Sequence, residues 1–265
     1  AASESADASF DAFVPHLSML VALFLALTSV GVLIYFIHHI PETINVGNIA
    51  AGIGAQLRDS VVDLFPAAER GRSETGVEMP AWDEKSPSMN RARVTPGVAG
   101  YIQALDEERL REIARDHALM IRVQYRPGDF VIEKDTVLDI WSEKDFGDER
   151  AEDLRACFAV GQRRTAHQNA LFLVDELVEI VARALSPGIN DPFTAITCLD
   201  WLKVGLASFL AHDHVNSYPD PADPVRIYPI DFRRFASSIF DQSRQYICAD
   251  RNVTLHAMAL LTDIA

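Results

Sequence analysis

The chain has 265 residues, enough to bury a sizeable core, and with 49% hydrophobic and 23% charged residues it has the composition of a folded protein. Its formal net charge of −14 excludes a protein that binds nucleic acid through a basic face, because lysine and arginine must neutralise the phosphates. Cys157, Cys198 and Cys248 are odd in number and lie far apart among apolar neighbours, so the sequence does not support a disulfide framework or a paired-cysteine metal site. We therefore expect buried free thiols in a reducing compartment.

Residues 1–16 are predicted to form a short external tail or loop. The chain begins with Ala1 rather than Met, so we expect processing, truncation or a missing upstream part. The stretch Leu17–Ile37 contains no charged residue and is long enough to cross a hydrocarbon core of ~30 Å. It lacks the basic front and the cleavage pattern of a signal peptide. A buried core helix is the alternative, but apolar residues surround the whole helix, so we predict a transmembrane helix over 17–40.

The residues that flank this span set its expected orientation. Acidic residues alone precede it, whereas the basic residues that follow it are Arg58, Arg70 and Arg72. Because positively charged loops remain in the cytoplasm, we expect the main domain on the cytoplasmic side of the membrane. Free cysteines agree with that side.

A second helix is predicted over residues 42–65, with an apolar face at spacings of three and four. Its small residues, among them Gly52 and Gly54, permit close approach of another helix. We expect this helix to pack against another subunit or an upstream helix; lining a pore or a lipid-exposed cavity is the alternative. Residues 66–90 are polar and predict a linker or mobile loop.

Residues 91–145 predict a small β-rich module. Short strand-like runs surround a charged amphipathic helix over 106–116, and Gly97, Gly100 and Gly128 are expected where the backbone turns tightly. The expected strands cover residues 98–105, 119–125, 130–132 and 136–141.

Residues 150–265 predict a helical domain. The run ALSPGINDPFTA at 184–195 ends one helix and begins the next, with Asp191 as the cap and Pro192 at the first helical position, where its missing N–H costs nothing. An irregular connection is expected over 212–229. The expected helices cover residues 152–160, 164–185, 192–211, 231–250 and 252–264.

Three motifs resemble a bacterial membrane-protein family known as the domain of unknown function 2254. They are GQRRTAHQN at 161–169, DELVEI at 175–180 and the SPGINDPFTA run. FDQSRQY at 240–246 is similar to the family's closing helix, and GYIQ at 100–103 with PGDF at 127–130 fits its middle region. The resemblance implies several N-terminal membrane helices, of which this chain has one clear span, so upstream helices are expected to be absent from it. It implies no established activity.

A candidate ligand-binding site is expected where the polar face of the helix over 164–185 meets the corner that follows it. The alternative interpretation is that the corner is purely structural and that the polar face of the helix is solvated or lies in a subunit interface. The pair Glu179–Arg183 agrees with that alternative, because such an ion pair is favourable even in an exposed helix. We assign no catalytic residue, metal ligand or cofactor, because His212 and His214 lack a nearby third ligand and no metal or nucleotide motif is present. The candidate residues are Arg164, His167, Asp175, Glu179, Arg183, Asn190 and Asp191.

The sequence thus predicts an α-rich membrane protein with a transmembrane helix, a small β-rich module and a C-terminal helical bundle. We expect a membrane-anchored homo-oligomer whose cytoplasmic domain is a scaffold or regulatory module, with membrane lipid and copies of itself as partners and no nucleic acid. The alternative is a subunit of an ion channel or transporter, with the helix over 43–65 near the permeation path. A third hypothesis is an enzyme that acts near the membrane through His167, Asp175, Glu179 and the Asn190–Asp191 corner.

Overall fold

The computed structural model describes residues 16–43, 46–65, 90–144, 146–211, 223–228 and 230–264. The predicted external tail, the predicted linker before Asn90 and the pair His212 and His214 lie outside the described residues. The chain divides into two compact units, Ala1–Asn48 and Ile49–Ala265.

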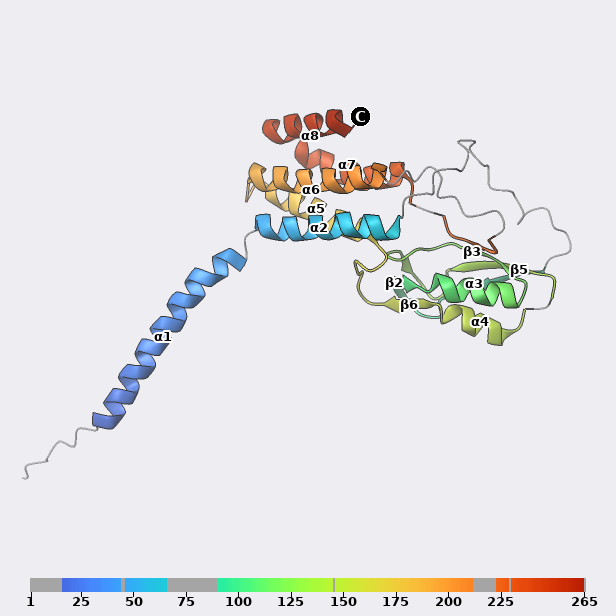
Figure 1. The fold of residues 1–265 in the computed structure, drawn as a ribbon, viewed down its shortest axis with the longest axis horizontal. Helices are drawn as coiled ribbons and strands as arrows, with labels where there is room; N and C mark the ends of the chain where they lie inside the picture. The colour runs from blue at the N-terminus through green and yellow to red at the C-terminus, as the bar shows by residue number, and fades with distance from the viewer. Residues whose placement is uncertain are drawn as a thin grey trace, which may run out of the picture. The chain divides into compact units, whose positions relative to one another are not determined.

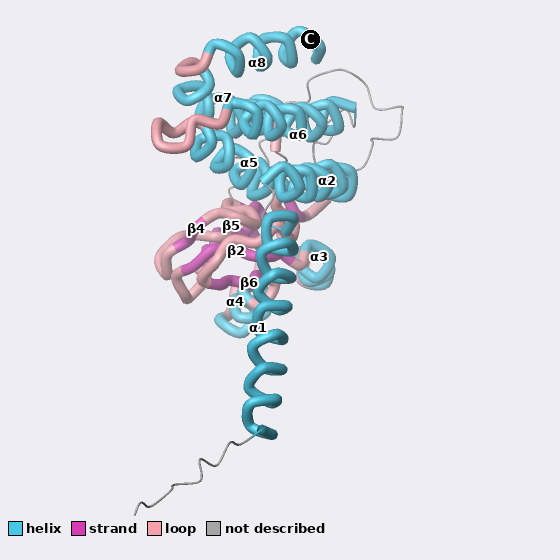
Figure 2. Tube along the Cα trace, turned by 90° about the vertical axis from the view of Figure 1, so that its left-hand side faces the viewer, coloured by secondary structure: helices cyan, strands magenta, loops and turns pink. Residues whose placement is uncertain are grey.

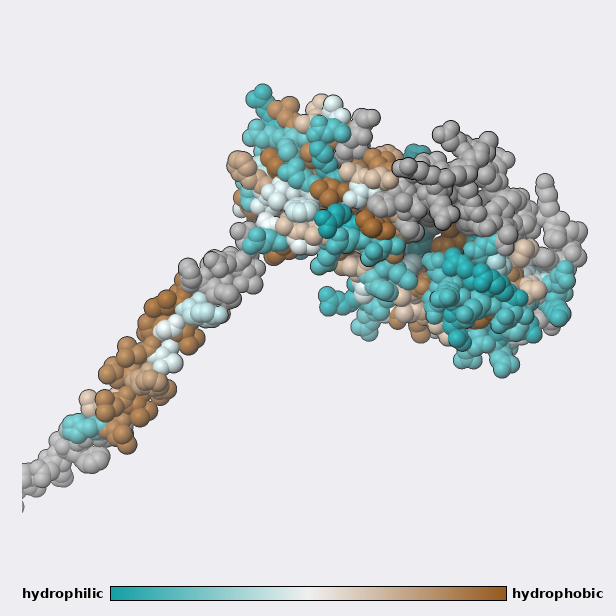
Figure 3. All heavy atoms as spheres, in the orientation of Figure 1, coloured by the Kyte–Doolittle hydropathy of each residue, from teal (hydrophilic) through white to brown (hydrophobic). Residues whose placement is uncertain are grey.

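The first unit contains α1 (His16–Thr43), an uninterrupted helix that continues through Pro41. Every side chain from His16 to Ile37 is exposed, and most of this helix is coloured as hydrophobic in Figure 3. A helix that is apolar all round and buries none of these side chains is suited to lipid rather than water. By length and composition alone, a second described helix, Pro192–Ala211, could also cross a membrane, but 39% of it is buried.

The second unit contains a helical bundle, to which α2 contributes from Ile49 onward. Figures 1 and 2 show α2 (Val46–Leu64) beside α5 (Ala170–Ala184) and α6 (Pro192–Ala211), with α7 (Phe232–Ile247) and α8 (Arg251–Ile264) on the other side of this pair. Leu57 and Val61 of α2 share one buried core with α5, α6 and α7, and the rings of Phe209 and Phe235 stack at its centre with centroids 4.7 Å apart.

The close packing of α2 depends on two glycines. A Cβ on Gly54 would lie 2.5 Å from ring carbons of Trp201, and a Cβ on Gly205 would lie 2.5 Å from Cδ2 of Leu57. Since carbon atoms in contact normally lie about 3.5–4.0 Å apart, neither position has room for a side chain. The small residues of α2 therefore allow close approach, as predicted, and the helix that they meet is α6 of the same chain.

The β-rich module has its own core and two small sheets. Its elements are β1 (Asn90–Val94), β2 (Gly100–Leu105), α3 (Glu107–Asp116), β3 (Met120–Val123), β4 (Phe130–Val131), β5 (Leu138–Ser142), α4 (Asp148–Arg155), β6 (Phe158–Gly161) and β7 (Val225–Arg226). One sheet has the order β1-β5-β3-β7, in which β3 and β7 are parallel and the other pairs antiparallel. The other sheet is antiparallel with the order β4-β2-β6. Asp106 caps α3, where its carboxylate accepts a hydrogen bond from the Arg109 N–H at 3.0 Å.

The structure corrects three predictions about this unit. The helix predicted over 152–160 is wrong at its end, because Phe158–Gly161 is β6 and pairs with β2. The helix predicted from Arg164 begins only at Ala170, and residues 162–169 form a loop. Gly97 and Gly128 have positive φ, as expected of tight turns, whereas Gly100 lies in β2, where a Cβ would come within 2.6 Å of the carbonyl oxygen of Gly161.

Candidate functional site

The corner between α5 and α6 satisfies its own backbone groups. The Ser186 N–H and hydroxyl both donate to the Arg183 carbonyl, at 3.1 and 2.7 Å, and the Asp191 N–H donates to the Ala184 carbonyl at 2.8 Å. Asn190 has a φ of 51°, a left-handed conformation that asparagine tolerates better than most residues. The SPGIND sequence is therefore explained locally as the end of one helix and the turn into the next.

Asp191 caps α6. Its carboxylate accepts hydrogen bonds from the Thr194 N–H at 3.1 Å and from the Thr194 hydroxyl at 2.5 Å, and these bonds hold its pKa below the ordinary value. A cap in this position satisfies a free N–H at the start of the helix and places a negative charge at its positive end. The cap predicted from the sequence is confirmed. Because the carboxylate is occupied in this way, it is a poor general base.

Arg164 and Asp175 form an ion pair that joins the loop before α5 to the bundle. Arg164 Nη1 lies 2.6 Å from Asp175 Oδ2, and both side chains are about 30% exposed. Gln242 of α7 donates to the other carboxylate oxygen at 3.4 Å, and the Arg164 guanidinium lies over the Phe172 ring at 5.4 Å. The arginine comes from the loop and not from α5, contrary to the prediction, and its partners explain it as a structural contact.

Glu179 and Arg183 form the i, i+4 pair that the spacing predicted. Both side chains are more than half exposed, so the pair stabilises the helix by only about 0.3–0.5 kcal/mol. The pair borders an open hollow of about 170 Å³ whose other walls are Ile53 of α2, Glu176 and Ile180. Burial, and then the charge of Glu179, raises the pKa of Glu176.

His167 lies apart from these groups. It is exposed in the loop before α5 and lines an open cleft of about 380 Å³ against the last turns of α2. The α2 side of the cleft is polar, and the charged groups there are Asp59 and Asp63. Among the described residues, no group of histidine, cysteine and acidic side chains is arranged to hold a metal ion.

The predicted candidate residues are therefore divided among separate places. Arg164 and Asp175 are brought together, as are Glu179 and Arg183, and Asn190 and Asp191 both belong to the corner. His167 faces the α2 cleft. The predicted meeting of the polar face with the corner is limited to Arg183, whose carbonyl accepts the two hydrogen bonds from Ser186.

Sequence reasoning missed the function of the GQRRTAHQN loop as a joint. Gln168 pairs with the backbone of Leu105 in β2: its Oε1 accepts from the Leu105 N–H at 2.9 Å, and its Nε2 donates to the Leu105 carbonyl at 3.2 Å. Gln103 of β2 donates in turn to the Arg163 carbonyl at 2.8 Å, and the Asn169 side chain caps α5. The asparagine before the apolar run ALFLV was the signal for a helix start at Ala170.

A second missed cluster surrounds Asp139 on one face of the larger sheet. Asp139 is only 4% exposed and accepts hydrogen bonds from Arg91 at 2.9 Å, Arg122 at 3.3 Å and Gln124 at 2.5 Å. Burial raises the pKa of Asp139, but the hydrogen bonds, led by that from Arg91, outweigh it, so the pKa is lowered. The alternation of polar and apolar residues in β3 and β5 could have revealed this polar face.

The guanidinium groups of Arg91 and Arg122 also lie over the ring of Trp141, at 5.4 and 5.1 Å. The cluster thus joins strands β1, β3 and β5 through ion pairs and cation–π contacts. Contacts that join neighbouring strands in this way are the arrangement of a structural network.

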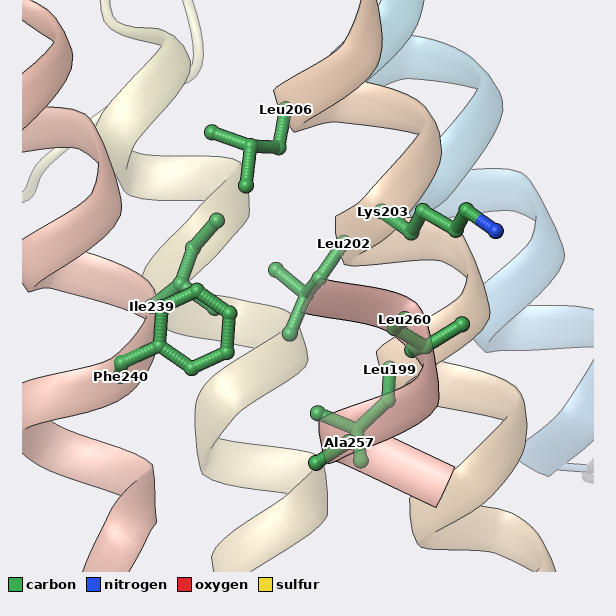
Figure 4. A pocket seen from close by; sticks show the side chains of 8 residues that line it. All are labelled: Leu199, Leu202, Lys203, Leu206, Ile239, Phe240, Ala257 and Leu260. Atoms are coloured by element: carbon green, nitrogen blue, oxygen red, sulfur yellow. The ribbon is translucent and has the colours of Figure 1, made fainter. Parts of the chain in front are cut away.

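An apolar hollow lies between α6, α7 and α8 (Figure 4). Its enclosed volume is about 10 Å³, which is room for a single water molecule at most. Lys203 stands at the edge with its amine directed away from the apolar side chains, and it pairs with Asp263 at 2.7 Å. The lining residues are Leu199, Leu202, Lys203, Leu206, Ile239, Phe240, Ala257 and Leu260.

Cys157 offers little reactivity. It is a buried free thiol, and burial raises its pKa to about 11, so the nucleophilic thiolate is scarce at neutral pH. Cys198 is also buried and free, whereas Cys248 is exposed, contrary to the expectation that all three are buried. The expectation of free thiols is confirmed.

Comparison with known proteins identifies the family. The model of a family described as predicted membrane protein (DUF2254) matches residues 2–263. Uncharacterized proteins of Mycobacterium bovis and Mycobacterium tuberculosis are each 29% identical over 196 residues, which is 72% of this chain and 36% of theirs. The chain thus spans about a third of the length of these relatives. No solved structure matches it. The chain belongs to the predicted membrane protein family DUF2254.

Proposed function

We propose that the protein is anchored in a membrane by α1 and assembles as a homo-oligomer whose folded unit is a scaffold or regulatory module. The observation that carries the anchor is the 22-residue stretch His16–Ile37, in which every side chain is exposed and the mean hydropathy is 2.6. Exposing this surface to water would be costly, whereas a hydrocarbon core of ~30 Å accommodates a helix of about 20 apolar residues.

A scaffold or regulatory role is supported by the way the candidate polar residues are used. Arg164 is paired with Asp175, Glu179 with Arg183, and Asp191 with the start of α6. The first contact joins the loop before α5 to that helix, and the other two stabilise α5 and the start of α6 locally. They do not bring His167 together with Asp175, Glu179 or the corner, which is the arrangement that the enzyme hypothesis requires.

The cytoplasmic side of a bacterial inner membrane is our proposal for the folded unit. It is supported by the arginines that follow α1 in the sequence and by the free thiols of Cys157 and Cys198. Attaching a membrane-impermeant thiol reagent to exposed Cys248 in whole cells tests the side: labelling only after the membrane is broken is expected, and labelling of intact cells would contradict it.

Extraction of the full chain at alkaline pH tests the anchor. The chain is expected to remain in the membrane, and the double substitution Leu27→Asp and Val30→Asp is expected to release it, because each central carboxylate costs about 3 kcal/mol in a bilayer. Leu27→Ile with Val30→Ile is the matched control and should behave like the parent. Release of the parent chain would refute the anchor. A strict monomer in detergent at micromolar concentration would refute the assembly.

The alternative of a channel or transporter subunit has a specific support in α2. This helix follows α1 after only two residues, and the exposed Gly52 has open space beside it. The face that carries Gly54 and Leu57 is occupied by α6, so only the other face of α2 would border a permeation path. Conductance of the purified chain in planar bilayers under tension and voltage tests this function, and its absence under both would exclude it.

A further inference from the structure

Two apolar side chains of the corner are directed into solvent. Phe193 is 78% exposed and Ile189 is 63% exposed, more than any other large hydrophobic residue among the described residues outside α1. The hydrogen bonds of the corner use only the backbone and the polar side chains of its neighbours. The turn itself therefore gives no reason for a phenylalanine and an isoleucine at these positions.

The packing of α2 shows at which end of the bundle the corner lies. The last turns of α2 face the beginning of α5 across the His167 cleft, whereas Ile53, nearer its start, faces Glu179 and Arg183 near the end of α5. The two helices are therefore antiparallel. The start of α2 lies at the end of the bundle where α5 finishes and the corner begins, as Figure 1 also shows.

The glycine contacts refine this placement. Gly54 lies against Trp201 and Leu57 against Gly205, so α2 and α6 run in the same direction. Ile49 is five residues before Gly54, and Ile196 is five residues before Trp201, so these two residues lie level along the two helices. Phe193 is three residues earlier on α6, which puts it about 4.5 Å beyond the level of Ile49, at the same end of the bundle.

The start of α2 is tied closely to the predicted span. Only two residues separate Thr43, the end of α1, from Val46. This link reaches at most about 11 Å, and the six helical residues between Ile37 and the end of α1 add about 9 Å. The start of α2 is therefore no more than about 20 Å of chain beyond Ile37, the last residue of the apolar stretch. Ile49, which is 43% exposed, adds apolar surface to the same end of the bundle.

We propose that Ile189 and Phe193 insert into the interfacial layer of the bilayer that α1 crosses, so that the α5–α6 corner is a second membrane contact. The inference rests on the proposed anchor. Aromatic and aliphatic side chains at the boundary of headgroups and acyl chains remove apolar area from water without crossing the bilayer. A second contact would fix the orientation of the bundle at the membrane surface.

Tryptophan substitution in the full chain, reconstituted into phosphatidylcholine–phosphatidylglycerol vesicles, tests the proposal. Phe193→Trp and Ile189→Trp each place a reporter at the corner and, because both sites are exposed, leave the core intact. Leu210→Trp is the matched control: it lies on the same helix, is 41% exposed and is 17 residues, or about 26 Å, from Phe193. The parent chain with its 3 native tryptophans supplies the baseline.

Lipids brominated near the glycerol end of their acyl chains are expected to quench the fluorescence of the tryptophans introduced at positions 193 and 189. The emission of these tryptophans should also shift to shorter wavelength. The fluorescence of the tryptophan introduced at position 210 should be unchanged. Emission at 193 that stays water-like and unquenched would overturn the proposal. A blue shift without quenching would overturn it as well, because a protein surface would then cover the corner. Alkaline extraction reports on α1 alone, so failure of the anchor is distinguished from failure of the corner.

Discussion

The packing of α2 on α6 predicts opposite effects for two alanine substitutions on one helix. Gly54→Ala introduces a Cβ 2.5 Å from ring carbons of Trp201, about 1 Å closer than carbon atoms normally approach. Gly52→Ala introduces the same atom two residues away, where nothing lies within 4 Å. The pair therefore separates the effect of the contact from the general effect of alanine in a helix.

The magnitudes follow from two opposing contributions. Alanine in place of glycine inside a helix stabilises by about 1 kcal/mol, and this is all that Gly52→Ala should change. At position 54 the rigid indole and the α2 backbone must separate, which costs about 1–3 kcal/mol for an overpacked contact. We expect Gly54→Ala to be less stable than Gly52→Ala by about 2 kcal/mol, or about 4–8 °C in Tm for a unit of this size.

Thermal unfolding of the detergent-solubilised chain, followed by circular dichroism, measures this difference. Gly205→Ala, which would meet Leu57, should resemble Gly54→Ala. Equal stabilisation by Gly52→Ala and Gly54→Ala would refute the packing of α2 on α6. A loss of assembly at unchanged monomer stability would instead indicate that the small-residue face meets another subunit, the interpretation first suggested by the sequence.

Three further outcomes test the contacts that organise the fold. Asp191→Ala should lower the free energy of unfolding by about 1 kcal/mol at neutral pH, and Asp191→Asn, which retains a capping side chain, should lower it by less. Because the folded-state pKa of Asp191 is lowered, the stability that its carboxylate contributes is present above the unfolded-state pKa of about 3.9 and is lost as the pH falls through the folded-state pKa. The urea unfolding curves of Asp191→Ala and the parent chain should therefore converge in acid. Gln168→Ala removes both hydrogen bonds to Leu105 and should cost about 1–2 kcal/mol in the same assay, and an unchanged midpoint would refute the proposed joint. Asp139→Ala leaves its arginines without their shared carboxylate and should cost about 3 kcal/mol, whereas a loss below that of Asp191→Ala would show that the network contributes little.

The sequence by itself determined the features that depend on local chemistry. An uncharged apolar stretch predicted α1, and the Asp-Pro pair at 191–192 predicted the start of α6, because a capping carboxylate and a proline without an N–H suit that position alone. Periodic apolar residues predicted α3 and α6–α8 close to their observed bounds.

Only the tertiary structure decided which pairings override local preference. Phe158–Gly161 is a strand because β2 offers it hydrogen bonds, and residues 162–169 stay out of α5 because Gln168 pairs with the backbone of β2. Asp139 meets its arginines through strands distant in sequence, and the glycines of α2 and α6 meet partners on one another's helix. Each of these depends on contacts between segments tens to more than a hundred residues apart, which no local pattern specifies. The same contacts place the corner, recognised in the sequence only as a helix stop and start, at the end of the bundle nearer the start of α2.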